Sequence, residues 1–220
     1  SSEYLKYDPK NPAWVGRDRF FLDPGHMAPM LYSQLCLIGK FSLEELQQLR
    51  QWGSPTTGHP EFEIARGIEN TSGPLGQGHV FAIGAAIAAK FLAAHTGNPT
   101  FEKETIYAYI SDGGIQEEIS QGGARIAGTL GLDNLIMFYD SNDIQLSTET
   151  KDVMNEDTAA KYRALGWEVI EICGNDVDQI ITFCADSLEL LSTVSVHFLY
   201  IVEDNEWILW GATKMLDSVG

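Results

Sequence analysis

The segment YISDGGIQEE, residues 109–118, carries a carboxylate at the end of a hydrophobic run. Asp112 stands there directly before Gly113 and Gly114, and Asn142 follows the next hydrophobic strand-like run in the same way, in FYDSNDIQL. A carboxylate and an amide oxygen, together with a backbone carbonyl, are ligands that Mg²⁺ prefers, and glycines let a backbone come close to a phosphate. These residue types at this spacing predict a site for a metal ion and a diphosphate.

The same residues also have a purely structural interpretation. Asp112 is a good cap for a helix that begins after the strand, and Asn142 is a common turn residue. Residue type and spacing leave both interpretations open.

A parallel sheet would bring two such residues together, because ligands of such sheets bind beyond the carboxyl ends of the strands. Apolar runs that alternate with helical segments predict an α/β domain whose parallel sheet is covered by helices on both faces. The predicted strands are 105–110, 134–140, 167–172 and 196–202, and the predicted helices are 28–37, 79–95, 117–131, 157–166 and 178–191.

The segments outside the predicted strands differ in character. The helix at 79–95 is apolar nearly all round, which indicates burial. Ser42 and Glu45 have the spacing of a helix capping box. Residues 1–25 are polar and turn-rich, so no strand is predicted there. Residues 52–78 form a long irregular stretch, and a loop of this length inside a domain is usually functional or disordered.

The composition limits which kinds of binding partner and which cellular compartment the sequence favours. The 220 residues are 44% hydrophobic, and the formal net charge of −17 argues against nucleic acid and against an anionic membrane. Three scattered cysteines without a CxxC pair predict a reducing, cytoplasmic compartment. The sequence predicts neither a signal peptide nor a membrane-spanning run. A dehydrogenase-type nucleotide site is disfavoured, since no GxGxxG follows the first strand.

Several motifs carry a resemblance to a known family. The pattern SDGG…SND resembles the fingerprint of thiamine-diphosphate enzymes. The segments RDRFFLDPGHMAPMLYSQL, GHPE, ENTSGPLGQG and RIAGTLGLDNLIMFYDSNDIQLS resemble the N-terminal, diphosphate-binding domain of transketolase, over about Lys10 to Ile180. The resemblance implies the thiamine-diphosphate-binding fold, with thiamine diphosphate and Mg²⁺ or Ca²⁺ as cofactors.

The resemblance also implies roles for the residues of the first motif. Asp112, Asn142 and the backbone carbonyl of Ile144 would bind the metal ion. Gly113 and Asn142 would contact the diphosphate of the cofactor.

Further roles are implied for the loops. The backbone of Gly73, Pro74 and Leu75 would lie along the aminopyrimidine side of the cofactor. The catalytic residues implied are His26, His59 and Glu117. His26 would lie near the diphosphate and the sugar, and His59 would face the substrate. Glu117 would lie at a dimer interface.

Each of these three residues has a structural alternative. A single histidine on a loop is often a solvated side chain. An acid such as Glu117 is favoured in the first turn of any helix.

The sequence departs from the family at several points. Ser111 replaces the first glycine of G-D-G, and Gly122 stands where the family usually carries a second acid. The opening SGHPG-type segment with its substrate-binding histidine has no counterpart here. We therefore interpret residues 1–220 as one diphosphate-binding domain, truncated at the N-terminus and with an atypical tail at 187–220.

The resemblance implies one half of a transketolase. Such a chain would transfer a two-carbon ketol unit from a ketose phosphate to an aldose phosphate. It would need a pyrimidine-binding domain or second subunit and would be inactive without it, and the assembly would be a homodimer or a heterotetramer. The alternative is a non-catalytic α/β module that binds a metal and a diphosphate.

Overall fold

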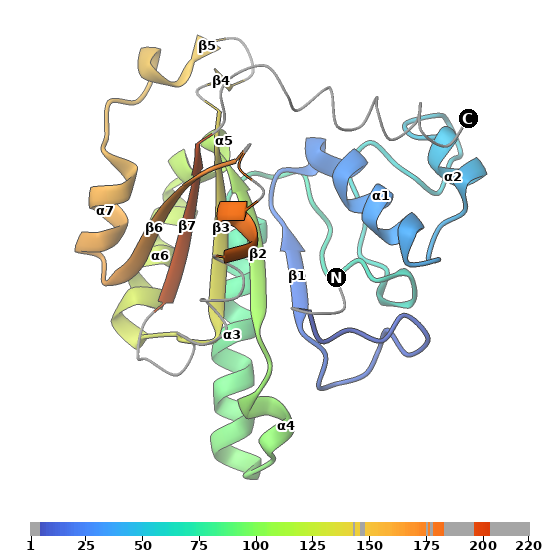
Figure 1. Ribbon diagram of the computed structural model, residues 1–220, viewed down its shortest axis with the longest axis horizontal. Helices are drawn as coiled ribbons and strands as arrows, with labels where there is room; N and C mark the ends of the chain where they lie inside the picture. The colour runs from blue at the N-terminus through green and yellow to red at the C-terminus, as the bar shows by residue number, and fades with distance from the viewer. Residues whose placement is uncertain are drawn as a thin grey trace.

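The structure is a computed structural model that describes residues 5–142, 144–145, 148–174, 176, 178–182 and 196–202. Its centre is a five-stranded sheet in the order β1-β2-β3-β7-β6, and every pairing in it is parallel (Figure 1). The strands are β1 (Arg19–Leu22), β2 (Ile106–Ser111), β3 (Leu135–Ser141), β6 (Trp167–Cys173) and β7 (Val196–Val202). The predicted parallel α/β sheet is confirmed, and 196–202 within the predicted atypical tail is one of its strands.

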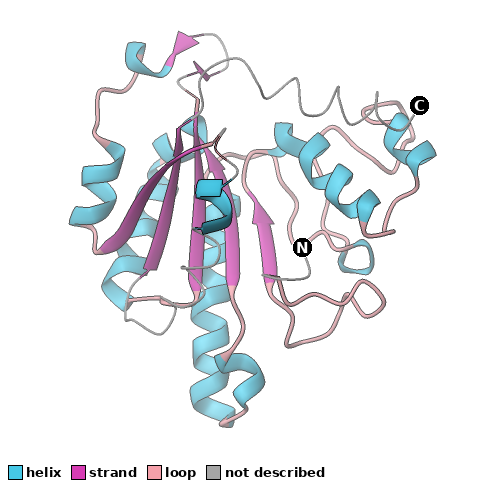
Figure 2. Cartoon of the chain, in the orientation of Figure 1, coloured by secondary structure: helices cyan, strands magenta, loops and turns pink. Residues whose placement is uncertain are grey.

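Helices cover both faces of this sheet (Figure 2). On one face lie α3 (Gln77–Thr96), α6 (Glu118–Leu130) and α7 (Thr158–Ala164), over a core that includes Ile106, Met137 and Trp167. On the other face, Ile180 of the helical residues 178–182 packs near Ile136. The rest of the helix predicted at 178–191 lies outside the described residues.

The strand β1 was not predicted from the sequence. It consists of the four residues RFFL, too few to show a period of two, within a segment that is otherwise polar. Its pairing with β2, which begins with Arg19 opposite Ile106, is what makes it a strand. Beside it lie α1 (Ala28–Leu37) and α2 (Leu43–Gln47), which enclose a second core around Leu22, Tyr32 and Phe41.

The short elements lie mainly around the carboxyl edge of the sheet. They are the 3-10 helices η1 (Gly25–Met27), η2 (Ile64–Arg66) and η3 (Thr150–Asp152), the helices α4 (Pro99–Glu102) and α5 (Asp112–Gln116), and the hairpin β4 (Ile144–Gln145) with β5 (Thr148–Glu149).

The ends of the helices follow from local chemistry. The capping box of Ser42 and Glu45 is present at α2. Gly131 ends α6 at a φ of 56°, a left-handed conformation that glycine adopts without strain. The helix predicted at 117–131 begins one residue later, because Glu117 is extended and separates α6 from α5. The helix that directly follows the SDGG motif is therefore the short α5.

The long helix α3 is only partly buried, so the predicted burial of 79–95 is wrong for one side. Its alanines, Ala82, Ala86 and Ala89 among them, pack against the sheet and α6. Its larger apolar side chains face outward, and Phe91 is 64% exposed. The helix face with small side chains packs closely on the sheet. The sequence pattern does not reveal that the face with large side chains is left uncovered in this chain.

Within the described residues, α3 is also long and apolar enough to span a membrane by length and composition, contrary to the sequence-based expectation. Its packing on β1, β2 and α6 explains this composition without a bilayer.

Candidate functional site

The carboxylate of Asp112 lies at the carboxyl edge of the sheet, where it is 2% exposed. Its Oδ1 accepts a hydrogen bond from the Tyr139 hydroxyl at 2.5 Å, and its Oδ2 accepts one from the Asn142 backbone N–H at 3.2 Å. The register between β2 and β3 places Ser111 opposite Asp140, so the two strands end side by side. The sequence-based prediction that Asp112 and Asn142 meet at one edge is confirmed.

The structural interpretation of Asp112 as a helix cap is wrong. The cap of α5 is Ser111, whose hydroxyl accepts the Gly114 N–H at 3.4 Å. Asp112 is the first residue of the helix, and its carboxylate accepts hydrogen bonds from Tyr139 of β3 and from the segment after that strand. Asn142 does have its turn role, since its Oδ1 accepts the Ile144 N–H at 3.1 Å.

Asp112, Asn142 and Ile144, which the resemblance implies as metal ligands, offer a carboxylate, an amide oxygen and a backbone carbonyl, the donor types that Mg²⁺ and Ca²⁺ favour. Gln116 of α5 donates to Gln145 of the β4–β5 hairpin at 2.8 Å, and this bond holds the hairpin against the helix. Among the described residues no group of three or more His, Cys, Asp or Glu side chains offers a metal site, so the amide and carbonyl oxygens would be needed.

The loop GPLGQG packs directly against the SDGG motif. A Cβ on Gly113 would stand 2.9 Å from Cδ1 of Leu75, and one on Gly76 would stand 2.8 Å from Cβ of Glu117. Both distances are shorter than real Cβ contacts, so the absence of side chains at Gly113 and Gly76 permits this approach. The structure thus brings Leu75, Gly113 and Glu117 together from two distant segments.

His59 lies between two glycines of the neighbouring loops. A Cβ on Gly25 would stand 2.8 Å from the His59 ring, and one on Gly73 would stand 3.1 Å from its Nδ1. Gly73 has a φ of 137°, which side chains rarely allow. The side chain of His59 is exposed, so its ring is available to a ligand beside the loop of Gly73 to Leu75.

His26 follows Gly25 in η1, and its side chain is also exposed. Partial burial, the neighbouring His59 and the cation of Arg50 all lower the pKa of His26 below its ordinary value. Because the protonated form is disfavoured, the His26 imidazole is neutral at pH 7.

Arg50 belongs to this cluster, although the sequence did not single it out. Its Nη2 donates to the backbone carbonyl of His26 at 3.1 Å. It is also a non-glycine residue with a positive φ, 62°, and such backbone strain is often found at functional sites. A positive φ is set by the surrounding contacts, so no local sequence signal marks it.

We expect Arg50→Gln to raise the pKa of His26 toward its ordinary value, because the variant removes a positive charge near the ring. The shift of the His26 ring protons with pH, followed by NMR, measures this. Arg125→Gln is the matched control, since Arg125 is exposed on α6 and no effect of it on His26 is found. An equal response of His26 to both variants would show that Arg50 has no local influence.

His79 is fully buried at the start of α3. Its Nδ1 lies 2.5 Å from the Ser120 hydroxyl, and this contact joins α3 to α6. Burial lowers the pKa of His79 to about 3, so the ring stays neutral. The ring therefore links the two helices that follow the GPLGQG loop and the SDGG motif.

The loop that carries the GPL segment is held to the base of the sheet by buried ion pairs. Arg17 donates through Nε and Nη2 to the two carboxylate oxygens of Glu69, at 2.7 and 2.9 Å. Both side chains are nearly inaccessible, and a bidentate pair of this kind fixes direction as well as position. The loop at 52–78, which the sequence predicts to be functional or disordered, is therefore anchored through Glu69 to the segment before β1.

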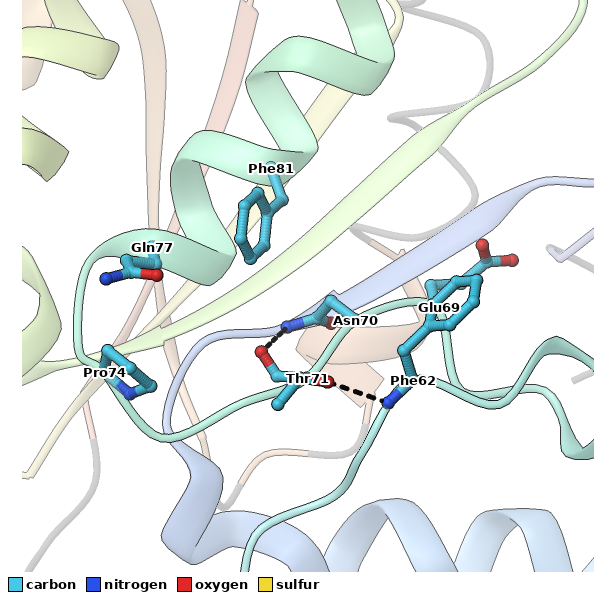
Figure 3. Close-up of a pocket in the computed structure, with 7 residues that line it drawn as sticks. All are labelled: Phe62, Glu69, Asn70, Thr71, Pro74, Gln77 and Phe81. Carbon is cyan, nitrogen blue, oxygen red and sulfur yellow. Dashed lines mark hydrogen bonds between the residues drawn. The ribbon is translucent and has the colours of Figure 1, made fainter.

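A pocket of about 360 Å³ lies between this loop and the start of α3 (Figure 3). Phe62 and Phe81 point into it from the loop and from α3, and Pro74 of the GPL segment lies at its border (Figure 3). The remaining lining residues are Glu69, Asn70, Thr71 and Gln77. The pocket places apolar rings beside the segment predicted to line the aminopyrimidine.

Known proteins share this arrangement of sequence and fold. A family model described as "Transketolase, thiamine diphosphate binding domain" matches residues 2–187. The transketolase of Mycobacterium leprae is 45% identical over 180 residues, which cover 78% of this chain. The chain spans only about a quarter of the curated relatives it matches, 26% of this one.

Solved structures agree with the sequence comparison. The transketolase of Leishmania mexicana superposes with a TM-score of 0.80 at 35% identity, over 92% of this chain and 30% of that one. A Pichia stipitis transketolase in complex with sedoheptulose-7-phosphate gives a TM-score of 0.80 at 36% identity, over 91% of this chain and 30% of that one.

Proposed function

This chain belongs to the transketolase family, where it matches the thiamine diphosphate binding domain, and on that premise we propose that it is the diphosphate-binding half of a transketolase. The reaction is the transfer of a two-carbon ketol unit from a ketose phosphate to an aldose phosphate, with thiamine diphosphate and Mg²⁺ or Ca²⁺ as cofactors. A structure in the family is a complex with a sugar phosphate, sedoheptulose-7-phosphate, which supports this class of substrate.

The observation that carries the proposal is the junction of two loops at the carboxyl edge of the sheet. Asp112 and Asn142 lie at adjacent strand ends, and Leu75 of the GPL segment packs on Gly113. One loop would supply oxygen donors for a metal ion at the diphosphate. The other would supply backbone groups to the aminopyrimidine side of the cofactor.

The chain's own residues have distinct tasks in this proposal. When bound, thiamine diphosphate supplies the carbanion stabilisation, and the protein binds and orients the reactants. Asp112, Asn142 and the Ile144 carbonyl would hold the metal, and Gly113 and Asn142 would contact the diphosphate.

The two histidines beside the loops would act on the sugar. His59 lies between Gly25 and Gly73 with its ring exposed, and we propose that it accepts a proton from a sugar hydroxyl. The neutral imidazole of His26 is suited to accept a hydrogen bond from a second hydroxyl.

The uncovered side of α3 and α6 supports an assembly with a second domain. It presents large exposed apolar side chains, which mark interaction surfaces when they gather on one face. They are Phe81, Ile87, Phe91, Ile119 and Ile126. We propose that this face meets the pyrimidine-binding domain, within a homodimer or a heterotetramer, and that exposed Glu117 lies in that interface.

The described cysteines Cys36 and Cys173 are free thiols, which agrees with the reducing cytoplasm that we propose as the compartment.

We expect the full chain alone, with thiamine diphosphate and Mg²⁺, to show no ketol transfer above background. Adding the separately expressed pyrimidine-binding portion of a transketolase relative should produce activity, because each half holds one side of the cofactor. A coupled assay of aldose-phosphate conversion measures it. Metal-dependent cofactor binding without turnover in the mixture would instead support the non-catalytic binding module.

A further inference from the structure

Asp23 is a buried acid at the end of β1, directly before the PGH segment. Its backbone N–H donates to the Tyr109 carbonyl at 3.0 Å, which continues the pairing of β1 with β2. The residue is 1% exposed, so water cannot solvate its carboxylate. Burial raises the pKa of Asp23, and hydrogen bonds from the backbone N–H groups of Gly76, His79 and Gly78 oppose this effect.

The partners of this carboxylate are backbone N–H groups at the start of α3. Oδ2 accepts from Gly76 at 3.0 Å and Oδ1 accepts from His79 at 3.3 Å. Helix starts leave N–H groups unpaired and carry partial positive charge, so a carboxylate is favoured there. Gly76 belongs to the GPLGQG loop, and Asp23 therefore fixes the end of that loop.

The oxygen that accepts from Gly76 also lies against the SDGG motif. A Cβ on Gly114 would stand 2.4 Å from Oδ2 of Asp23. A Cβ on Gly78 would stand 2.6 Å from Cα of Asp23, with its backbone N and the Leu22 carbonyl at 2.9 Å. Asp23 is thus enclosed between two glycines, one from each loop of the site.

We propose that Asp23 is a positioning residue that sets the distance between the GPLGQG loop and the SDGG motif, and thereby the affinity for thiamine diphosphate. The inference rests on the proposed function, because the two loops would hold opposite ends of that cofactor. Asp23 need not touch the cofactor. Its two carboxylate oxygens accept hydrogen bonds from the start of α3. Its contact with Gly114 fixes how closely the SDGG motif approaches.

The test compares Asp23→Asn with Asp18→Asn in the full chain. Asp18 is a second buried acid at the opposite end of β1. It accepts the backbone N–H groups of Lys6 at 2.8 Å and Thr105 at 2.9 Å, and its Oδ1 also lies 3.1 Å from the Lys6 ammonium. Each variant keeps the shape of the side chain but turns one acceptor into a donor. If both aspartates had a purely structural role, the two substitutions would change the Kd for thiamine diphosphate to the same extent.

We expect Asp23→Asn to weaken Mg²⁺-dependent thiamine diphosphate binding about tenfold in calorimetry, the effect of losing one hydrogen bond to a charged group. Asp18→Asn should leave the Kd within about twofold even if it lowers Tm as much. Equal changes of Kd in the two variants would overturn the proposal.

Hydrogen exchange gives a readout that needs no cofactor. In Asp23→Asn we expect faster amide exchange in residues 73–79 and, jointly, in 112–116, whereas Asp18→Asn affects neither. Unchanged exchange in 112–116 would overturn the coupling of the loops. If the unmodified chain failed to bind thiamine diphosphate even with the pyrimidine-binding portion, the proposed function would fail, while the exchange comparison would still decide the role of Asp23.

Discussion

We expect Asp112→Asn to abolish the magnesium-dependent binding of thiamine diphosphate that we propose for this chain. The variant removes the carboxylate from the three oxygen donors and leaves amide and carbonyl oxygens, which bind Mg²⁺ far more weakly. It also turns one oxygen that accepts from Tyr139 or from Asn142 into a donor. We expect the Kd to rise by more than about 100-fold, because losing a direct metal ligand costs more than losing an outer-shell partner, which costs about 10–100-fold.

Titration calorimetry with and without Mg²⁺ measures this effect, on the full chain and again with the pyrimidine-binding portion present. Glu118→Gln is the matched control, because it removes one negative charge from an exposed position in the first turn of α6. Its Kd should stay within about twofold, since an exposed charge is screened by solvent. If both variants weakened binding alike, net charge and not ligation would be the cause.

Gly128→Ala severely destabilises the domain. Gly128 lies in α6 where the turn after α7 crosses it, and an added Cβ would stand only 1.9 Å from the backbone carbonyl oxygen of Leu165. A backbone atom cannot rotate away, so α6 and the start of β6 would have to separate. This separation would also displace Trp167 and break the hydrogen bond that its Nε1 donates to the Ala124 carbonyl at 2.8 Å. We expect a loss of about 3 kcal/mol in the free energy of unfolding.

Urea unfolding gives the free energy, and Gly122→Ala in the same helix provides the comparison. Nothing lies within 4 Å of a Cβ on Gly122. This variant should stabilise the domain by about 0.5–1 kcal/mol, the intrinsic gain of alanine over glycine in a helix. A similar loss in both variants would mean that the contact with Leu165 is not the cause of the destabilisation.

The local pattern of the sequence predicts the main strands well. Strands β2, β3, β6 and β7 begin and end within one or two residues of the predicted ranges, because runs that are buried on both faces stand out from the polar segments between them. The short β1 has no such signal. It exists through its pairing with β2, a contact between segments far apart in the chain.

The outer face of α3 is a second feature that the local sequence pattern could not predict. A nearly all-apolar pattern predicts burial, and the alanine side is buried as expected. The pattern cannot show whether the side with Phe81 and Phe91 is covered by the chain itself or by another domain.

The sequence by itself determined the parallel α/β fold and the meeting of Asp112 with Asn142. Both residues follow consecutive strands, and the carboxyl ends of neighbouring parallel strands must lie at the same edge. The tertiary structure alone decided how the other loops meet there: Leu75 on Gly113, His59 between Gly25 and Gly73, and Asp23 against Gly76 and Gly114. Such contacts depend on the close approach of distant backbones, which no local period of hydrophobicity encodes.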